Sequence, residues 1–454
     1  MIGPAAIKDH LRVDVALSSG MVDALQTWSL MYENKATWLG TNIHSLNLSA
    51  AIASEIARAV TIEMAVNLSG GPRADYLAAQ LQPVLTRLRA KVEVGAAKGG
   101  LMLKPYPSNG AILVDFVQAD QFYPVTFDAN GHITACIFAD QRQVGSYTYT
   151  RLELHQMTPD GCVIRNRAFR GNGPNDLGQP VELGAVEAWA NLQPEATILG
   201  IEKPLFAYFR FPLANNVDPS SPLGVSCYSR AVGPIEQADR QWSRYLWEFE
   251  SGERALYVDE LAFGKDANGK PILPDKRLYR TLNAGGSIAD ETLFEDWTPT
   301  LRQVEQWAAL QTMLERIEFL CGLAFGTLCD PQIVAKTATE IAASKQRSQA
   351  TITDTQKALE TALNDLLYAM DVWATLNALA PAGTYQVAYD FDDSLIVDSE
   401  ARFTQDARAV GMGAMPLVIF LMRNYGLPEN EAKKWVEMKQ AEQPADFFGS
   451  ESGA

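Results

Sequence analysis

The sequence predicts an α+β protein in which helical and β-rich regions are segregated along the chain. Residues 101–169 contain short strand-like apolar runs separated by turn signals, whereas the first 66 residues and most of the chain after Pro222 show helical spacing. Residues 336–379 contain neither proline nor glycine, which predicts a single helix far longer than the usual length of about 8 to 20 residues.

Composition narrows the functional class. The chain has 454 residues, of which 47% are hydrophobic and 20% charged, as expected for an ordinary soluble protein of two or three domains. Its net charge of -16 argues against tight binding to nucleic acid, because that needs clustered Lys and Arg. The five cysteines form no C-x-x-C pair, so neither a disulfide framework nor a zinc site is expected.

Membrane and secretion signals are not expected either. The first nine residues lack a basic segment followed by an apolar stretch, so the chain shows no secretory signal. The longest apolar run, residues 411–422, is shorter than the roughly 20 residues that a membrane helix needs.

The N-terminal half begins with helices and continues with strands. An alanine-rich amphipathic helix is expected over residues 50–66 and a short one over 76–88. Asp128 to Gly131 is typical of a hairpin turn, because Asn and Gly adopt positive φ readily. His155 beside Glu153 could be a general base, but a residue on the surface of a strand is favoured. The expected strands are 101–103, 111–116, 133–138, 147–155 and 163–169.

Two helices with a three-four apolar spacing follow. The first ends at Gly252, and the second is expected to begin at Thr298-Pro299, an N-cap followed by proline at the first helical position. We expect the two to pack together or against neighbouring copies. Their seam residues are Ile235, Trp242 and Phe249 on the first helix, and Trp307, Leu314 and Ile317 on the second.

The polar insert between these helices, residues 255–294, has strand-like pieces at 255–258 and 276–282. Gly264 to Gly269-Lys270 resembles a phosphate-binding loop, but Pro271 occupies the Ser/Thr position, so a hairpin turn is favoured. The local positive charge fits either an acidic partner or a solvated hairpin edge. It comes from Lys265, Lys270, Lys276, Arg277 and Arg280.

The long helix has two different halves. Thr337 and Glu340 form a capping box at its start. Residues 344–355 are polar almost all round and must face water, a polar partner or a polyanion, unless they simply bridge solvent. A kink or local unwinding is expected at residues 351–353, where β-branched residues weaken the helix. The apolar stripe of the second half comprises Leu359, Leu363, Leu366, Met370 and Trp373.

The remaining chain is a strand at 385–391, helices after Asp398 and a polar tail after residue 440. Asp390, Asp392, Asp393 and Asp398 could bind a divalent cation, although capping and turn roles are favoured. We find no His-Glu-x-x-His helix and no Gly-x-Ser-x-Gly elbow. The sequence therefore indicates no enzyme, no cofactor and no catalytic or metal residues.

The order of these elements resembles the portal proteins of tailed bacteriophages, the head-tail connectors, and most of all the siphophage type. That order is a helix, a polar insert, a second helix, a glycine-containing loop and a long helix. The stretches that carry the resemblance are residues 98–106, 147–155, 221–226, 336–341 and 391–398. The resemblance spans residues 95 to about 439.

The resemblance implies a ring of twelve copies at one capsid vertex, through which DNA is packaged and ejected. It implies a virion protein assembled in the host cytoplasm, without enzymatic activity. The implied partners are other copies of the chain, double-stranded DNA bound without sequence preference, the terminase large subunit, the head-tail adaptor and the major capsid or scaffolding protein, with no membrane partner.

The resemblance also assigns parts of the chain to a portal architecture. Residues 1–223 would be a wing, 224–254 and 295–321 the two stem helices, 255–294 a clip, 322–335 a tunnel loop, 336–380 a tunnel helix, 381–397 a returning wing strand, 398–440 a crown, and 441–454 a mobile tail. Basic residues on the tunnel helix would contact phosphates weakly or form salt bridges in the ring. The implied channel residues are Gly326, Cys329, Asp330, Gln332, Lys336, Lys345 and Arg347.

Two other functions remain open at this point. A monomeric capsid adaptor or scaffold would close its two apolar helices on themselves. A nucleotide-driven DNA-handling enzyme would depend on Lys270.

Overall fold

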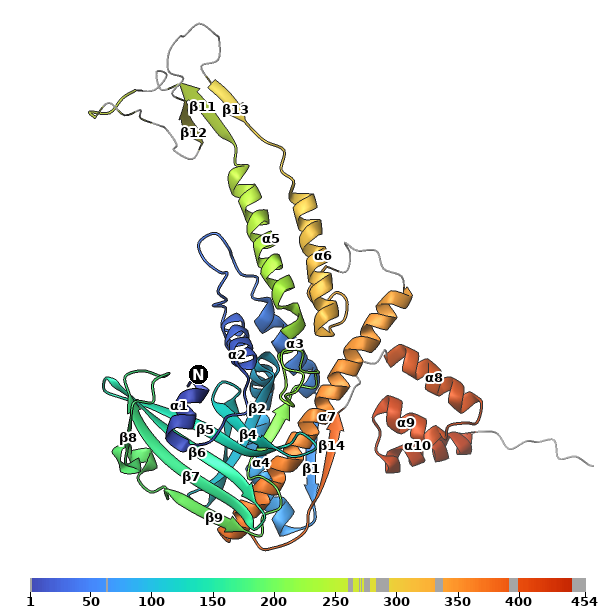
Figure 1. Ribbon diagram of the computed structural model, residues 1–454. Helices are drawn as coiled ribbons and strands as arrows, with labels where there is room; N and C mark the ends of the chain where they lie inside the picture. The colour runs from blue at the N-terminus through green and yellow to red at the C-terminus, as the bar shows by residue number, and fades with distance from the viewer. Residues whose placement is uncertain are drawn as a thin grey trace, which may run out of the picture. The chain divides into compact units, whose positions relative to one another are not determined.

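The computed structural model describes residues 2–62, 64–259, 264–268, 270, 272, 278–282, 294–330, 338–391 and 399–442. The chain forms two compact units, Met1–Tyr389 and Asp390–Ala454. Helices and strands both contribute extensively and the sheets are open, which confirms the α+β class (Figure 1).

The described helices and strands have the following bounds. The α-helices are α1 (Pro4–Leu11), α2 (Ser19–Tyr32), α3 (Leu48–Thr61), α4 (Pro72–Lys98), α5 (Val232–Ser251), α6 (Gln303–Cys321), α7 (Ala338–Leu376), α8 (Ser399–Gly411), α9 (Leu417–Tyr425) and α10 (Glu429–Glu442). The strands are β1 (Met64–Ser69), β2 (Gly100–Ser108), β3 (Ala111–Gln118), β4 (Phe122–Phe127), β5 (Ile133–Val144), β6 (Tyr147–Thr158), β7 (Gly161–Gly171), β8 (Gln179–Val181), β9 (Glu195–Leu199), β10 (Ala207–Arg210), β11 (Ala255–Asp259), β12 (Tyr279–Leu282), β13 (Phe294–Trp297) and β14 (Gln386–Phe391). Three short 3-10 helices lie at Leu183–Ala185, Glu187–Trp189 and Ser229–Ala231.

These strands form four sheets. The largest is antiparallel with the order β4-β5-β6-β7-β8, and β9 also pairs with β7. A second antiparallel sheet has the order β10-β2-β3, and a third, β12-β11-β13, lies between α5 and α6 in the sequence. β1 pairs with β14. The five predicted strands are confirmed as β2, β3, β5, β6 and β7, and the predicted turn at Asp128 joins β4 to β5.

The largest sheet is covered on one face by α1. Ile2 and Ile7 are buried against Tyr123, Leu152 and Phe169 in one apolar cluster. The backbone N–H of Ile2 donates to the Tyr123 hydroxyl over 2.8 Å, which fixes the N-terminal segment to β4. Burial raises the pKa of Tyr123 far above its usual value.

Two predictions for the first hundred residues are wrong. The helix expected to reach residue 66 ends at Thr61, and the following residues form β1, because they pair with a strand more than 300 residues later. The helix expected at 76–88 is the 27-residue α4. The part beyond Leu88 includes Gly95, which lies against the ring of Phe209, where an added Cβ would come within 3.0 Å of the ring.

α7 is a continuous helix of 39 residues. Of its predicted apolar stripe, Leu359, Leu363, Leu366 and Met370 are fully buried, and Trp373 is half-buried. The helix contacts α3, β2 and β10 and passes beside the sheets (Figure 1). The helix is unbroken at residues 351–353, so the local unwinding predicted there is wrong. The side chain of Ile352 is buried, which stabilises these turns. The capping box at Thr337 lies outside the described residues.

The end of α7 is fixed by one buried arginine. Arg73, at the start of α4, is 2% exposed, and its Nε donates to Asp371 Oδ1 over 2.6 Å. Its other nitrogens donate to the Thr375 hydroxyl and to the Ala380 carbonyl. Because the guanidinium serves acceptors within and just beyond the last turn of α7, it joins the end of this helix to the start of α4.

The unit that begins at Asp390 contains α8, α9 and α10, which confirms helices after Asp398. Phe420, Leu421 and Ala432 form its small core. Of the predicted acidic cluster, only Asp390 is a described residue. Across the described residues, no group of His, Cys, Asp and Glu side chains is arranged to hold a metal ion. Within the same described ranges, no helix combines the length and apolar character needed to cross a bilayer.

Candidate assembly and nucleic-acid interface

α5 and α6 lie side by side and lead to the small sheet β12-β11-β13 (Figure 1). Ile235, Leu314 and Ile317 are buried, as the predicted seam requires. Trp242 and Trp307 are only half-buried, and Phe249 is exposed. The buried apolar residues therefore lie in the half of the helix pair that is nearer the larger sheets.

The other half of the pair is held by polar contacts and an aromatic group. Gln241 Nε2 donates to the Gln306 backbone carbonyl over 3.2 Å. Tyr245 stacks on Trp242 and contacts Trp307 with ring centroids 5.5 Å apart. The three-four spacing of apolar residues did not predict this polar half, because Gln241 is not one of the spaced apolar residues and was therefore not considered.

An ion pair joins the end of α5 to the residue before α6. Glu248 Oε2 accepts from the Arg302 guanidinium over 2.9 Å, and Glu248 Oε1 accepts from the Arg302 backbone N–H over 2.9 Å. These hydrogen bonds lower the pKa of Glu248. The predicted helix start at Thr298-Pro299 is wrong, because Thr298 donates its hydroxyl to Asp296 and the helix begins only after Arg302.

The loop after α6, residues 322–330, folds back onto that helix. Gly322 and Gly326 both have positive φ, of 71° and 84°, which glycine adopts without strain. The Glu318 carboxylate, at the end of α6, accepts backbone hydrogen bonds from Leu328 and Cys329. The described part of the predicted tunnel loop is therefore a folded segment with defined hydrogen bonds.

Basic and acidic side chains gather where α6 ends and α7 begins, since Arg347 lines a pocket together with Glu315, Glu318 and Glu340. The guanidinium carbon of Arg347 lies 4.4 Å from the centroid of the Phe319 ring, and that of Arg316 lies 5.1 Å from it. Both arginines and Lys345 are exposed, and Phe319 and Arg347 line an open pocket between the two helices. Sequence reasoning named Lys345 and Arg347 but missed Arg316, because only the contact between the helices brings Arg316 to Arg347.

The other predicted channel residues differ in their placement. Cys329 is buried and its thiol donates to Glu318, so it is not accessible to a ligand in this arrangement. Asp330 is half-buried and its backbone N–H donates to Gln311. Gln332 and Lys336 lie outside the described residues.

The predicted basic residues of the insert are also only partly described. Lys265, Lys270 and Arg280 are exposed, and Lys276 and Arg277 lie outside the described residues. The Asp266 backbone N–H donates to the Lys270 carbonyl over 2.8 Å, and Asp266 Oδ1 accepts the Lys270 N–H. This closed turn confirms the hairpin interpretation, because the backbone N–H of Lys270 is already bonded within the turn.

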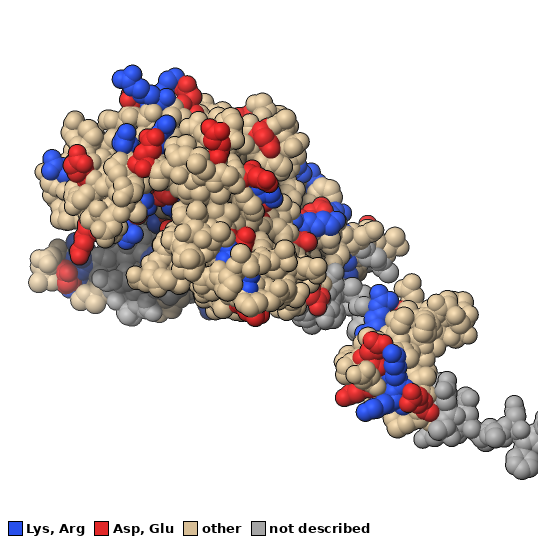
Figure 2. Space-filling view, turned by 90° about the horizontal axis from the view of Figure 1, so that it is seen from below, with Lys and Arg blue, Asp and Glu red and all other residues tan. Residues whose placement is uncertain are grey.

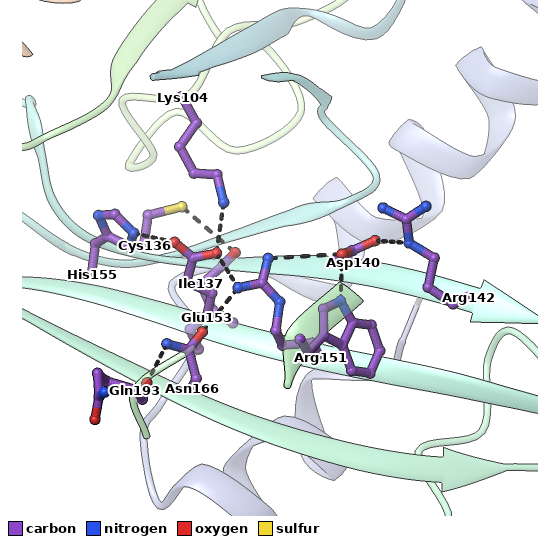
Figure 3. Close-up of polar contacts among 11 residues, drawn as sticks. Lys104, Cys136, Ile137, Asp140, Arg142, Arg151, Glu153, His155, Asn166 and Gln193 are labelled. Carbon is purple, nitrogen blue, oxygen red and sulfur yellow. Dashed lines mark hydrogen bonds and ion pairs between the residues drawn. The ribbon is translucent and has the colours of Figure 1, made fainter. Parts of the chain in front are cut away.

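One polar group of the large sheet was misjudged from the sequence (Figure 3). His155 is 2% exposed, so its prediction as a surface residue is wrong. Its Nε2 lies 2.7 Å from Glu153 Oε1, and Glu153 Oε2 accepts from Lys104 Nζ over 2.6 Å. Burial alone would raise the pKa of Glu153, but Lys104, His155 and Arg151 together hold it well below its ordinary value. This group joins β2 to β6 across two sheets and carries a structural role.

The match to a known family decides the identity. Residues 86–445 match the family described as phage portal protein, SPP1 Gp6-like. This chain belongs to the phage portal protein family. The match begins within α4 and ends after α10, so it includes α5, α6, the insert and α7. No curated protein sequence matches the portal chain.

Family membership agrees with the surface of the portal chain. Portal proteins are structural components of tailed-phage capsids that act in genome packaging, and they form oligomeric rings. On the face shown in Figure 2, acidic and basic side chains are interspersed and do not form a continuous basic surface. This distribution differs from the clustered basic surface that extensive phosphate neutralisation requires.

Proposed function

We propose that this portal protein closes into a ring of twelve copies at one capsid vertex and forms the channel through which DNA is packaged and ejected. The observation that carries the proposal is the division of α7. Lys345 and Arg347 in its first turns are exposed, whereas the apolar face of its later turns, with Leu359, Leu363 and Leu366, is fully buried. A helix that is anchored at one end and polar at the other can form part of the wall of an aqueous channel.

The proposed architecture follows from how the elements are connected. α5 and α6 would form the stem, and the sheet β12-β11-β13 between them in sequence would belong to the clip, residues 255–294. The segment 322–335 would be the tunnel loop, 336–380 the tunnel helix and 398–440 the crown. Residues 1–223 would form the wing, and the pairing of β14 with β1 supports the return of residues 381–397 to it.

DNA contacts in the proposed channel would be few and weak. Arg316, Lys345 and Arg347 are the cations that the described structure places near the start of α7. Each phosphate contact contributes counterion-release affinity, and an extended set of such contacts would hold DNA in place. A small set within a chain of net charge -16 is consistent with DNA that slides.

Contacts between subunits would use the outer faces of the helix pair. Trp247 on α5 is 64% exposed and Val304 on α6 is 71% exposed. Large apolar side chains exposed on a folded subunit are commonly covered by a partner. In a ring with rotational symmetry, one face of each subunit meets a different face of the next, so both helices can take part.

The remaining partners would meet other parts of the chain. The exposed Lys265, Lys270 and Arg280 of the clip would face acidic surfaces of the terminase large subunit and later of the head-tail adaptor. The major capsid or scaffolding protein would contact the wing.

Light scattering with negative-stain imaging tests the proposal. Twelve copies of a 49.8 kDa chain would form a particle of about 600 kDa with a central hole. The substitution Trp247→Glu should prevent ring closure, because it places a charge in an apolar contact. Val144→Glu, at another half-exposed apolar residue, is the matched control. A monomer at every concentration, and in the presence of scaffolding protein, would contradict the proposed function.

A further inference from the structure

We propose that Glu318 is the positioning residue of the loop 322–330, and that its carboxylate determines the shape of this loop. This inference rests on the proposed function only in assigning the loop to the channel. Glu318 Oε1 accepts from the backbone N–H groups of Leu328, over 2.5 Å, and Cys329, over 3.0 Å. Glu318 Oε2 accepts from the Gly326 N–H and the Cys329 thiol, each over 3.3 Å.

Glutamate side chains usually lie in water, but the Glu318 side chain is buried. Glu318 is only 2% exposed, and a carboxylate withdrawn from water is stable only when donors surround it. The donors here are loop N–H groups that belong to no helix or strand, and such groups also need partners when they are withdrawn from water. The carboxylate and the loop therefore satisfy each other, as in backbone concavities that bind anions.

Two further contacts tie the same loop to both neighbouring helices. Gln311, 2% exposed on α6, accepts from the backbone N–H of Asp330 over 2.6 Å. Ser344, on α7, accepts from the backbone N–H of Phe325 over 2.7 Å. These two contacts hold Phe325 and Asp330, which flank the residues 326–329 that Glu318 binds. Loss of Glu318 would release residues 326–329 while Phe325 and Asp330 stay attached.

Cys329 provides a chemical probe of this loop. Its thiol is buried, and burial together with the hydrogen bond to Glu318 raises the pKa of Cys329 to about 11. The thiolate is the nucleophile that attacks an alkylating reagent, so Cys329 should react slowly while the loop is held. A loop released from Glu318 would expose the thiol and return its pKa toward the ordinary range.

The test is alkylation of the assembled full-length protein with N-ethylmaleimide at neutral pH, with Cys329 followed by peptide mass spectrometry. Glu318→Gln should raise the alkylation rate of Cys329 by about tenfold or more, because one oxygen acceptor becomes an NH₂ donor. Glu318→Asp keeps the charge but withdraws the carboxylate by about 1.5 Å, so we expect a smaller increase. Glu305→Gln removes the same charge from an exposed position of α6 and should leave the rate unchanged.

Rates for both Glu318 variants equal to that of the unsubstituted protein would overturn the proposal. The Asp variant decides the question if the Gln variant does not assemble. Hydrogen exchange of residues 323–330 gives a second measurement, and it should rise in the same order as alkylation.

DNA packaging by the same variants separates this proposal from the proposed function. Faster alkylation with a changed packaged length supports both the positioning role and the channel assignment. Faster alkylation with unchanged packaging supports the positioning role and contradicts the placement of this loop in the channel.

Discussion

The guanidinium of Arg347, on α7, lies 4.4 Å from the ring centroid of Phe319, on α6, and Arg316 approaches the same ring. The aromatic ring holds two cations close together on a chain that is acidic overall. Arg316 and Arg347 lie near Glu315 and Glu340, so each helix contributes charges of both signs to this part of the proposed channel wall.

Replacement of Arg347 by Ala should weaken DNA binding to assembled rings in a salt-dependent way. If Arg347 contacts one phosphate, the slope of log K against log salt should fall by about 0.9. Binding titrations on short duplexes at several salt concentrations measure this slope. Lys357→Ala removes a cation from an exposed position further along α7 and should leave the slope unchanged. An identical slope for Arg347→Ala and the unsubstituted protein would remove Arg347 from the set of contacts.

Gly322→Ala should destabilise the junction between α6 and the loop. Gly322 has a φ of 71°, which costs about 1–2 kcal/mol for a residue with a Cβ, and the added Cβ would also overlap with Thr351 Oγ1. Thermal unfolding at fixed protein concentration measures the loss. In a Thr351→Ala background the same glycine substitution should cost less, because only the backbone strain remains. An equal loss of stability in the two backgrounds would show that the contact with Thr351 does not contribute to the destabilisation.

Glu153→Gln should destabilise the protein by about 3–5 kcal/mol at neutral pH, because it leaves the buried Lys104 without its charged partner. The pKa of Glu153 is lowered in the folded state, so its stabilising contribution exists above the ordinary glutamate pKa of 4.5 and is lost as the pH falls further. The difference in unfolding midpoint between the variant and the unsubstituted protein should therefore narrow in acid. Glu195→Gln, which breaks an exposed pair with Arg165, should change little at either pH. A difference that stays constant from neutral to acidic pH would argue against the ionised form of Glu153 as the source of this stability.

Arg73→Ala should cost about 3–5 kcal/mol of stability, since Asp371 loses its buried partner. Arg73→Lys should recover only part of that loss, because an ammonium cannot reach the Asp371 carboxylate, the Thr375 hydroxyl and the Ala380 carbonyl together. Denaturant unfolding at fixed protein concentration provides the comparison. Full stability of the Lys variant would show that charge alone, without the forked geometry, is sufficient.

Local patterns in the sequence predicted the elements whose signals are local. The stripe from Leu359 to Met370 is buried as its spacing requires, and the turn at Asp128 follows from its residue types. The pairing of β1 with β14 could not be predicted, because a six-residue run does not indicate a partner more than 300 residues away. Residues 64–66 consequently read as the end of a helix.

The candidate site was harder to predict than the fold. His155 read as a surface residue because its neighbours Phe138 and Phe206 are distant in the sequence, and because the Lys104 that pairs with Glu153 comes from a different sheet. No prediction for Glu318 came from the sequence, because only the folded loop shows which donors surround its carboxylate. Gly322 and Gly326, which follow at the end of the helix, were the sequence signal for this folded loop. Glycine adopts positive φ readily, and two such residues allow the chain to turn back toward the helix end.

The attachment of α7 at both ends has a mechanical consequence. Its far end is joined to α4 through Arg73, and its near turns are joined to α6 through Ser344 and the loop. The 39-residue helix between them is about 58 Å long and cannot shorten without breaking its own hydrogen bonds. A displacement of the exposed first turns should therefore move the whole helix and reach the strands that it contacts, β2 and β10.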